Sequence, residues 1–592
     1  MFDPVYRIWL IKYLAQTFFP PIALCYLLSI IVQSGIWRFF AFSACFIATP
    51  FFWATFGYLQ DWRDIVNAKK LGARVVPLIR GKRFGDVDLI AKWANGIQKG
   101  YIGAIFDELL DEAGTDTARL SLLGVDRIIT RDHDVMKFVL STGFPFFEKG
   151  ETGALRSGSF FGKGIFTADG DQAKMHRALA RPYFARERIS EYESFAKYTN
   201  KLIVVLGRAI SSGEPIDVQD MFARFTMDTA GEFLFGTSDL NTLDLPFPKA
   251  SEAVLGPKGI ATDTVYGGFV QAFEQGQINT HKRVGQPIPF WAAREFIVDS
   301  QTETAKVIQE FLEPLARKAL ERKAQVLASG EKMDEESFLD HLALSTDDVT
   351  LVKDQLLNMM LAARDTTAGL LSFTCYLLAM YPDVMSRLRT EVLTAFGPTG
   401  LPTYDSLKTL KYLRAVLNES LRIFPPVPLN LRSSKGPTII PTRQGPLYIP
   451  RQGWQITWSV AAIHKRKDLW GDDADDFVPE RWMGERAKDI AADPFQFIPF
   501  NAGPRICLGQ QFAYNEASFV LVRLLQVIDN FTVAQAEAAP AGSLPPDEWK
   551  LRQGRQAIEK IHPQSAMTLY SKGGLWLRMH LASSSGTDEL PI

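Results

Sequence analysis

The amino-acid sequence predicts a mainly α-helical fold with small β-sheets, preceded by N-terminal membrane-spanning helices. Helical apolar spacing dominates the chain, and one uninterrupted stretch runs from about Val349 to Met380. Short strand-like pieces occur near Pro437–Ile456 and Leu569–His580. Two uncharged apolar runs lie near the N-terminus. Together these features predict a membrane anchor followed by one large helical unit.

The first 60 residues contain the two candidate membrane helices. Tyr13–Trp37 carries no charge, and Phe39–Leu59, which follows Arg38, is again uncharged and rich in phenylalanine. About 20 apolar residues cross a bilayer, so we expect the second run to span it, although Pro50 could kink it. The first run contains two adjacent prolines and could span, tilt or lie in the interface. Neither run has the short apolar core and small-residue cleavage site of a signal peptide.

Basic residues flank both apolar runs. Arg7 and Lys12 precede the first run, and six Lys or Arg residues occur between Lys69 and Arg83, after the second. Positively charged flanks favour the cytosolic side of a membrane, so both flanks are expected there. This topology requires two spans or a hairpin, and it leaves the rest of the chain in the cytosol.

Charge and cysteine content exclude several classes of protein. The 592 residues carry a formal net charge of −1 and no basic block, which argues against binding to nucleic acid. The four cysteines show neither a disulfide framework nor zinc-ligand spacing, which suits a reducing compartment: Cys25, Cys45, Cys375 and Cys507. No Gly-x-Gly-x-x-Gly motif follows a strand, so electrons for a redox reaction would have to come from another protein.

Two segments look inserted into the helical pattern. Asp244–Pro289 is rich in Gly, Pro and Phe, whereas Ala534–Gln564 is polar and contains several prolines. Clusters of this composition are typical of loops, and we expect the second segment to be an exposed one.

A loop at residues 500–509 gives the strongest functional signal. It reads Phe-Asn-Ala-Gly-Pro-Arg-Ile-Cys-Leu-Gly and directly precedes an apolar helical pattern over Gln510–Phe531. Its glycines allow backbone geometry, and a close approach to a flat ligand, that a side chain would hinder. The loop therefore predicts a planar ligand held through five positions: Phe500, Gly503, Arg505, Cys507 and Gly509.

Cys507 is the candidate metal ligand in this loop. The amides at the start of the following helix would point toward its sulfur and stabilise a thiolate. A thiolate bound to haem iron favours O–O cleavage. Arg505 supplies a forked cation suited to a haem propionate. A lone cysteine is more often a buried structural thiol, but five positions matched at once favour the ligand.

This loop resembles the haem-binding signature of the cytochrome P450 superfamily, and four further segments match in the family's order. The resemblance implies a cytochrome P450-like fold with haem b (iron protoporphyrin IX) as cofactor. It also implies that the protein is a monooxygenase, which inserts one oxygen atom from O2 into its substrate.

Glu419 and Arg422 form one of the matching segments, a Glu-x-x-Arg pair at i,i+3 on a predicted helix. In the family this pair is buried and joined by a second arginine, which the resemblance places at Arg481. The implied role of the three residues is structural, as a network that holds the cysteine loop.

Ala362–Thr367, inside the long central stretch, resembles the family's oxygen-activation motif. The resemblance implies that Thr366 donates a hydrogen bond to bound dioxygen and that Asp365 helps relay protons from solvent. The family usually has glycine where this chain has Ala363. The alternative is a mid-helix threonine that bonds back to a carbonyl of its own helix.

Lys174–Arg177 resembles the segment that binds haem propionates in the family. His176 and Arg177 are the implied carboxylate contacts, and Arg432 is a further candidate. The family's tryptophan falls at Ala173, so one donor is missing.

The resemblance also implies partners and location. Electrons would come from NADPH–cytochrome P450 reductase, and the endoplasmic reticulum membrane would hold the protein with its catalytic domain in the cytosol. The expected organisation is a membrane anchor over residues 1–60, a basic, proline-containing linker over 61–84 and a haem-binding catalytic domain over 85–592. The substrate would be lipophilic and reach the protein through membrane lipid.

The substrate itself is less constrained. Gly162–Gly170, Arg181–Glu187 and Ala363–Ala368 resemble the fungal branches that hydroxylate long-chain alkanes and fatty acids at or near the chain end. An apolar pocket lining is expected from Met360, Leu361, Val427, Leu429 and Leu575. The alternatives are a tailoring oxidase of a terpenoid or another fungal secondary metabolite, and a haem protein that does not oxidise its ligand.

Overall fold

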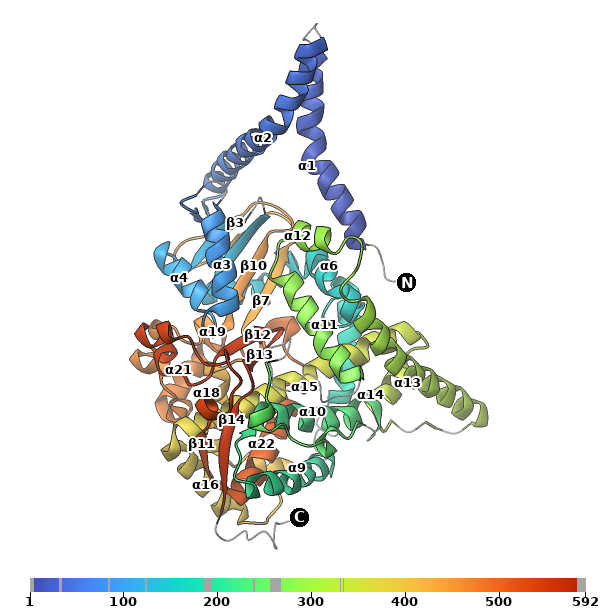
Figure 1. The fold of residues 1–592 in the computed structure, drawn as a ribbon, viewed down its shortest axis with the longest axis vertical. Helices are drawn as coiled ribbons and strands as arrows, with labels where there is room; N and C mark the ends of the chain where they lie inside the picture. The colour runs from blue at the N-terminus through green and yellow to red at the C-terminus, as the bar shows by residue number, and fades with distance from the viewer. Residues whose placement is uncertain are drawn as a thin grey trace.

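The structure is a computed structural model that describes residues 5–30, 35–83, 86–122, 125–184, 193–237, 240–255, 268–330, 332–333 and 335–582. Helices make up most of the body, and four small sheets accompany them in the described residues (Figure 1). The predicted mainly α fold with small sheets is confirmed. The strand-like pieces near Pro437–Ile456 and Leu569–His580 are strands.

The helices of the N-terminal half end with the long central helix α15. They are α1 Val5–Ile30, α2 Gly35–Lys70, α3 Val87–Lys99, α4 Ala104–Glu112, α5 His133–Lys137, α6 Gly150–Phe161, α7 Gly170–Ala180, α9 Glu193–Ser211, α10 Val218–Phe235, α11 Gly268–Val284, α12 Ile288–Arg294, α13 Thr302–Ser329, α14 Phe338–Ser345 and α15 Val349–Met380.

The remaining helices follow α15. They are α16 Pro382–Phe396, α17 Tyr404–Leu407, α18 Lys411–Ile423, α19 Val460–Ile463, α20 Lys467–Trp470, α21 Gly484–Ala492, α22 Gln510–Val527 and α23 Gln535–Ala538. The pattern over Gln510–Phe531 predicts a helix that is too long, because the chain changes to strand β11 after Val527.

The strands form one six-stranded sheet, two of three strands and one of two. Their bounds are β1 Arg74–Val75, β2 Leu78–Ile79, β3 Thr117–Leu122, β4 Val125–Thr130, β5 Phe147–Glu148, β6 Ile216–Asp217, β7 Leu429–Ser434, β8 Thr438–Ile440, β9 Leu447–Ile449, β10 Gln455–Ser459, β11 Ile528–Val533, β12 Pro563–Ala566, β13 Thr568–Ser571 and β14 Trp576–Leu581. The six-stranded sheet has the order β2-β3-β4-β10-β7-β5 and places β5 beside β7.

Helix α15 is the axis of the body. Asp348 caps its start by accepting hydrogen bonds from the amides of Thr350 and Leu351 at 2.9 and 3.2 Å. The helix ends just before Pro382, which cannot continue it. Apolar side chains surround it on most sides, so the helix lies in the middle of the core. Its predicted bounds, Val349 to Met380, are confirmed.

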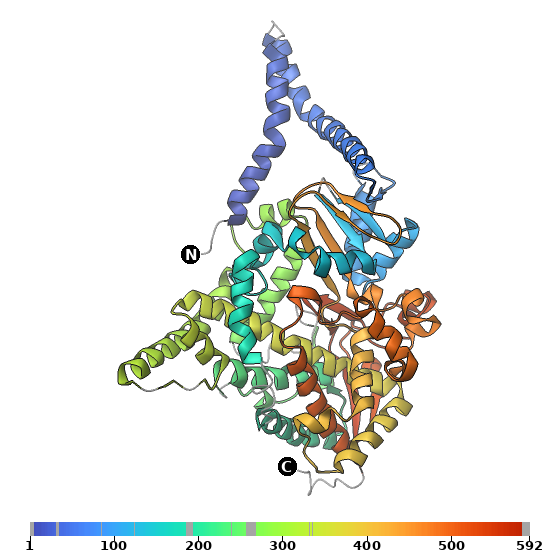
Figure 2. The same cartoon turned by 180° about the vertical axis from the view of Figure 1, so that it is seen from behind.

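The N-terminal helices α1 and α2 form a hairpin that projects from the body, and both of its ends return to the body (Figures 1 and 2). Tyr6, near the start of α1, donates a hydrogen bond to the backbone oxygen of Glu295 at 2.7 Å. At the other end, Asp61 of α2 forms an ion pair with Arg119 at 2.8 Å. Helix α2 continues without a break past residue 60 to Lys70.

Among the described residues, no single helix combines the length and the apolar composition needed to cross a membrane. By these criteria alone, one bent pair passes, α15 with α16, and α15 is mostly buried in the core.

The prediction of an exposed loop over Ala534–Gln564 is only partly confirmed, because Leu551 and its neighbours are exposed but other parts of the segment are buried. Trp549 is only 5% exposed and packs edge-on against Tyr101, with ring centroids 5.4 Å apart. Arg555 and Glu559 are buried and form an ion pair at 2.6 Å. The segment therefore combines exposed polar residues with a buried ionic pair, and composition alone does not distinguish the two.

Candidate functional site

The loop that ends at Cys507 is fixed by its backbone. Gly503 has φ of +63°, and a Cβ there would overlap the carbonyl oxygen of Leu140, so this position requires glycine. The Cys507 amide donates to the oxygen of Phe500 at 2.9 Å, which closes the loop. A Cβ at Gly509 would meet only Phe184, at 3.8 Å. Protein contacts therefore do not explain that glycine, whereas a ligand lying against the loop would.

Cys507 faces an internal space. Its side chain is exposed, although burial raises the pKa of the thiol; the Gly509 N–H and the charge of Arg177 act in the opposite direction. The Gly509 amide at the start of α22 thus hydrogen-bonds the sulfur, as expected of a helix N-terminus. An exposed yet desolvated thiol indicates a hollow lined by protein.

The opposite wall of this space is one face of α15. Ala362, Ala363, Asp365 and Thr366 are partly exposed, although the turns before and after them are buried. Their i, i+1, i+3 and i+4 spacing places them on one side of the helix. Ala363 packs against the same apolar cluster as Leu508, the residue after Cys507, so the helix face and the loop border the same part of the interior.

Cations gather beside the loop. Arg505 donates to the backbone oxygen of Ala168 at 2.8 Å, and Arg177 donates to that of Ile506 at 2.8 Å. Burial, and then the charge of Arg505, lower the pKa of Arg432 to about 10. Burial, and then the charges of Arg432 and Arg505, hold the pKa of Lys149 well below its ordinary value. Four positive groups therefore repel one another in a partly desolvated place.

The carboxylate that the structure places among these cations is that of Asp169. It already accepts the backbone amides of Lys149 and Gly150 at 2.9 and 2.8 Å and lies 3.4 Å from Arg505. One shared carboxylate does not balance four cations. His176, buried nearby on α7, keeps its Nδ1 without a hydrogen-bond partner in the described part of the chain. These residues fit a ligand with two carboxylates, as the propionates of haem are.

The structure joins Glu419, Arg422 and Arg481 in one fully buried network. Arg422 donates to both Glu419 oxygens, at 2.9 and 2.8 Å, and Arg481 donates to Oε1 at 2.8 Å. The Val478 amide and the Trp482 indole add bonds at 3.0 and 2.9 Å. The carboxylate is thus saturated by donors from two segments. Removing one partner of such a pair costs about 3–5 kcal/mol, because it leaves an uncompensated buried charge.

His464 connects this network to the cysteine loop. Its Nδ1–H donates to the backbone oxygen of Arg422 at 3.1 Å, and its Nε2 accepts from the Ile498 amide at 3.1 Å. The second bond requires neutral imidazole. Burial, and then the charge of Arg422, lower the pKa of His464 to about 3. His464 therefore joins the Arg422 segment to the segment that leads into the cysteine loop.

On the α15 side, Thr366 donates its hydroxyl to the oxygen of Ala362 at 2.6 Å, the back-bond considered as the alternative above. The side chain nevertheless belongs to the partly exposed helix face. Asp365 lies 3.0 Å from Arg364 and accepts from Thr568 at 3.4 Å. Glu516 of α22 is buried beside Thr367, and burial raises its pKa to about 8, opposed by the hydrogen bond from that hydroxyl.

Only some of the residues predicted to line the pocket have exposed side chains. Val427 is 36% exposed and Leu429 is partly exposed, at the start of β7. Leu361 is mostly buried, and Met360 and Leu575 have no exposed surface. These last two cannot touch a ligand in this conformation. Apolar character alone does not separate a core position from a pocket position.

Sequence reasoning missed Lys149 and Glu516. Lys149 reaches the cation cluster because β5 pairs with β7, with Phe147 opposite Ser434 and Glu148 opposite Ser433. No local signal marks that pairing. Glu516 lies on the helix that starts after Cys507, two turns in, and a carboxylate inside an apolar helical pattern is a signal that could have identified it.

Replacing His464 with Gln should weaken the dependence of stability on pH. The native pKa is about 3, whereas an unfolded histidine titrates near 6.5. The contribution of His464 to the free energy of unfolding is therefore fully present above about pH 6.5. It falls toward pH 3, by about 2 kcal/mol between pH 7 and pH 5. The variant should lose less than wild type over this interval, as measured by urea denaturation at both pH values. Equal losses in the two proteins would contradict the assignment.

Known proteins resemble this chain along most of its length. The family model described as "Cytochrome P450" matches residues 93–543. Cytochrome P450 52E1 of Candida apicola is 36% identical over 79% of this chain and 88% of its own. Cytochrome P450 52A12 of Debaryomyces hansenii is 35% identical over 80% and 89%. Cytochrome P450 monooxygenase g430 of a Fusarium species is 36% identical over 73% and 75%.

These similarities, with the loop and its partners, establish what the protein is. It binds haem b and is a haem-thiolate monooxygenase. The expectation of a haem protein that does not oxidise its ligand is therefore not supported. The chain belongs to the cytochrome P450 family.

Proposed function

We propose that this monooxygenase inserts one oxygen atom from O2 into a long-chain alkane or fatty acid, at or near the chain end. The observation that carries the proposal is the partly exposed apolar pair Val427 and Leu429, which can form an apolar wall for the chain. The three segments that resemble fungal alkane and fatty-acid hydroxylases support it. Primary C–H bonds are stronger than secondary ones, so the wall must hold the chain end-on.

Cys507 is proposed to hold the haem iron through its thiolate. Bound haem would supply the activation of O2, which a thiolate ligand favours. Gly503 and Gly509 would let the backbone approach the haem closely, together with Phe500 of the same loop. The haem carboxylates would be held by the cationic residues at the loop: Arg505, Arg177, His176, Arg432 and Lys149.

Thr366 and Asp365 are proposed to deliver protons on the α15 side. The Thr366 hydroxyl lies on the partly exposed face of the helix, and its back-bond to Ala362 fixes its oxygen in place as an acceptor and relay. Asp365 links that face to Arg364 and Thr568. The two side chains would together bring protons to this face of the helix while the apolar walls limit water.

We further propose that residues 1–60 anchor the protein to the endoplasmic reticulum membrane, with 61–84 as linker and 85–592 as the cytosolic catalytic domain. Exposed apolar side chains on α1 and α2 support this, among them Phe19, Leu27, Phe51 and Leu59. Both ends of the hairpin meet the same body, so both must lie on one side of a membrane. The electron donor would be NADPH–cytochrome P450 reductase, and lipid would deliver the substrate.

Cys507→Ala should abolish the strongly red-shifted Soret band of the reduced, carbon monoxide-bound protein, because the thiolate is lost. The difference spectrum of the purified variant measures this. Cys375→Ala is the matched control, since Cys375 is buried in α15 with no comparable loop. Retention of the band in the Cys507 variant would refute the ligand assignment.

Thr366→Ala should retain haem but release more hydrogen peroxide per NADPH consumed, because proton delivery becomes slower than loss of reduced oxygen. Peroxide and product are quantified together in the presence of reductase. Ser372→Ala is the matched control: Ser372 makes the same back-bond in α15, to Ala368 at 2.7 Å, but is buried. Unchanged coupling in the Thr366 variant would move the role elsewhere.

Val427→Phe should shift the oxidised carbon of a long alkyl substrate, because a larger side chain changes how far the chain end can reach. Terminal and subterminal products of alkanes and fatty acids are separated by gas chromatography. Leu551→Phe, at an 87% exposed position, is the control. Turnover of a polycyclic terpenoid, with long alkyl chains ignored, would instead favour the tailoring-oxidase alternative.

Deleting residues 1–60 should release much of the protein from membranes, as measured by fractionation. Glycosylation tags at the N-terminus and in the turn after Lys70 should both stay unmodified, since both ends of the hairpin face the cytosol. Modification of either tag would refute the topology, and an unchanged membrane fraction of the deletion variant would refute the anchor.

A further inference from the structure

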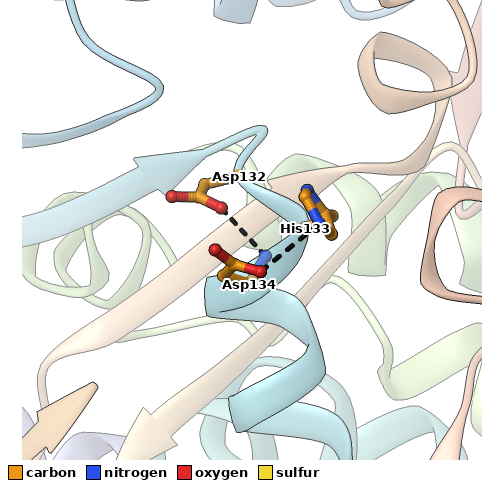
Figure 3. A group of neighbouring side chains, drawn as sticks. All are labelled: Asp132, His133 and Asp134. Carbon is orange, nitrogen blue, oxygen red and sulfur yellow. Dashed lines mark hydrogen bonds and ion pairs between the residues drawn. The ribbon is translucent and has the colours of Figure 1, made fainter. Parts of the chain in front are cut away.

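A group of side chains of metal-binding type lies at the end of strand β4 in the six-stranded sheet, outside the loop that ends at Cys507. Asp132, His133 and Asp134 lie where β4 gives way to α5, and one ligand atom from each lies within 4.8 Å of the others (Figure 3). Asp493, at the end of α21, reaches the same place, because its Oδ2 lies 3.3 Å from His133 Nε2. Nothing in the monooxygenase reaction uses these residues.

His133 is buried without a hydrogen bond. Its side chain belongs to a residue that is 5% exposed, and neither ring nitrogen makes a hydrogen bond to any residue that the structure describes. Nε2 lies 3.3 Å from Asp134 Oδ1 and also 3.3 Å from Asp493 Oδ2. Both separations are longer than the usual N–H···O distance of about 2.9 Å. The imidazole therefore points between two carboxylates that it does not bind directly.

The spacing is that of two ligands on one tetrahedral metal ion. Zinc binds histidine nitrogen and carboxylate oxygen at about 2.0–2.1 Å, and two such ligands at a tetrahedral angle are about 3.3 Å apart. Asp134 and Asp493 both stand at this distance from Nε2. Asp132 uses Oδ1 to accept the Asp134 amide at 2.8 Å, which leaves its other oxygen for the fourth position.

The charge of the group also calls for a divalent cation. The group contains three carboxylates, those of Asp132, Asp134 and Asp493, and the last two each lie 3.3 Å from His133 Nε2. The nearby cation is Arg443, whose guanidinium lies 3.6 Å from Asp134 and 3.9 Å from Asp493 and whose side chain is 72% exposed. An exposed ion pair of this length contributes little. With neutral imidazole, the group therefore carries about two uncompensated negative charges.

We propose that His133, Asp134 and Asp493, with Asp132 as fourth ligand, bind one zinc ion. The mixed nitrogen and oxygen donor set suits zinc, and four protein ligands are typical of a structural site. The alternative occupant is a proton, which would make His133 an imidazolium held between two carboxylates.

The position of Asp493 gives this zinc a structural consequence. The same carboxylate accepts the Phe495 amide at 3.3 Å, and Ile498, three residues farther, donates to His464. A metal ion here would tie α5 to the segment that leads into the cysteine loop. Zinc would therefore stabilise the fold rather than take part in oxidation.

The test uses the full-length, haem-loaded protein after removal of adventitious metal with a chelator. Zinc is titrated in competition with a chromophoric zinc chelator. Wild type should bind about one zinc ion per chain, and His133→Gln and Asp493→Asn should each weaken binding by about tenfold or more. His580→Gln and Asp489→Asn, both at exposed positions, are the matched controls and should bind as wild type does.

A second measurement keeps the proposal testable if one variant folds poorly. Zinc should raise the urea midpoint of wild type and of both controls but not that of Asp493→Asn, whose side chain is one third exposed and tolerates replacement. Wild type that binds zinc no more tightly than either ligand variant, or that zinc does not stabilise, would overturn the site and leave the proton as the occupant.

Discussion

The buried carboxylate of Glu419 is the constraint on which the catalytic half of the molecule depends. It lies in an interior where a charge is tolerated only with full compensation, and its compensation comes from two separate segments, α18 and the turn at Pro479–Trp482. Because the donors are rigid and directional, these segments have one relative position. His464 extends the constraint to the Ile498 amide, and from there the chain has nine residues to reach Cys507. The position of Cys507 is thus set by charged groups that do not contact it.

The same principle, with the sign reversed, operates at the other end of the loop. There the protein gathers cations instead of neutralising them, and Lys149 and Arg432 lie beside Arg505 at a cost that the polypeptide alone does not offset. A fold of this kind is more stable with its dianionic cofactor than without it, since ligand binding stabilises the native state. The charge of Glu419 is balanced by the chain itself, whereas the charges of Lys149, Arg432 and Arg505 are not fully balanced by carboxylates that the structure describes. The first network needs no partner, and the second suits an anionic ligand.

Sequence reasoning succeeds where a short segment contains the whole physical reason for its structure. The bounds of α15, Val349 to Met380, follow from apolar spacing, an Asp cap and a proline, and the Cys507 loop follows from its own glycines. It fails where the reason lies in a distant segment. Lys149 joins the site through strand pairing, and Trp549 and Arg555 are buried by contacts with Tyr101 and Tyr381. Helix length at Gln510 was overestimated because tertiary pairing of β11 with β14 overrides helical spacing.

The hairpin of α1 and α2 is attached to the body at both of its ends. A domain on one flexible linker can swivel and tumble, and its partners must find it in many orientations. Here Tyr6 fixes one leg of the hairpin and Asp61 the other, on different parts of the body. Two points of attachment restrict rotation of the body relative to the hairpin, whereas a single flexible linker would allow it. The domain then keeps a fixed orientation relative to the hairpin. Fewer relative orientations remain to be sampled when another molecule approaches it.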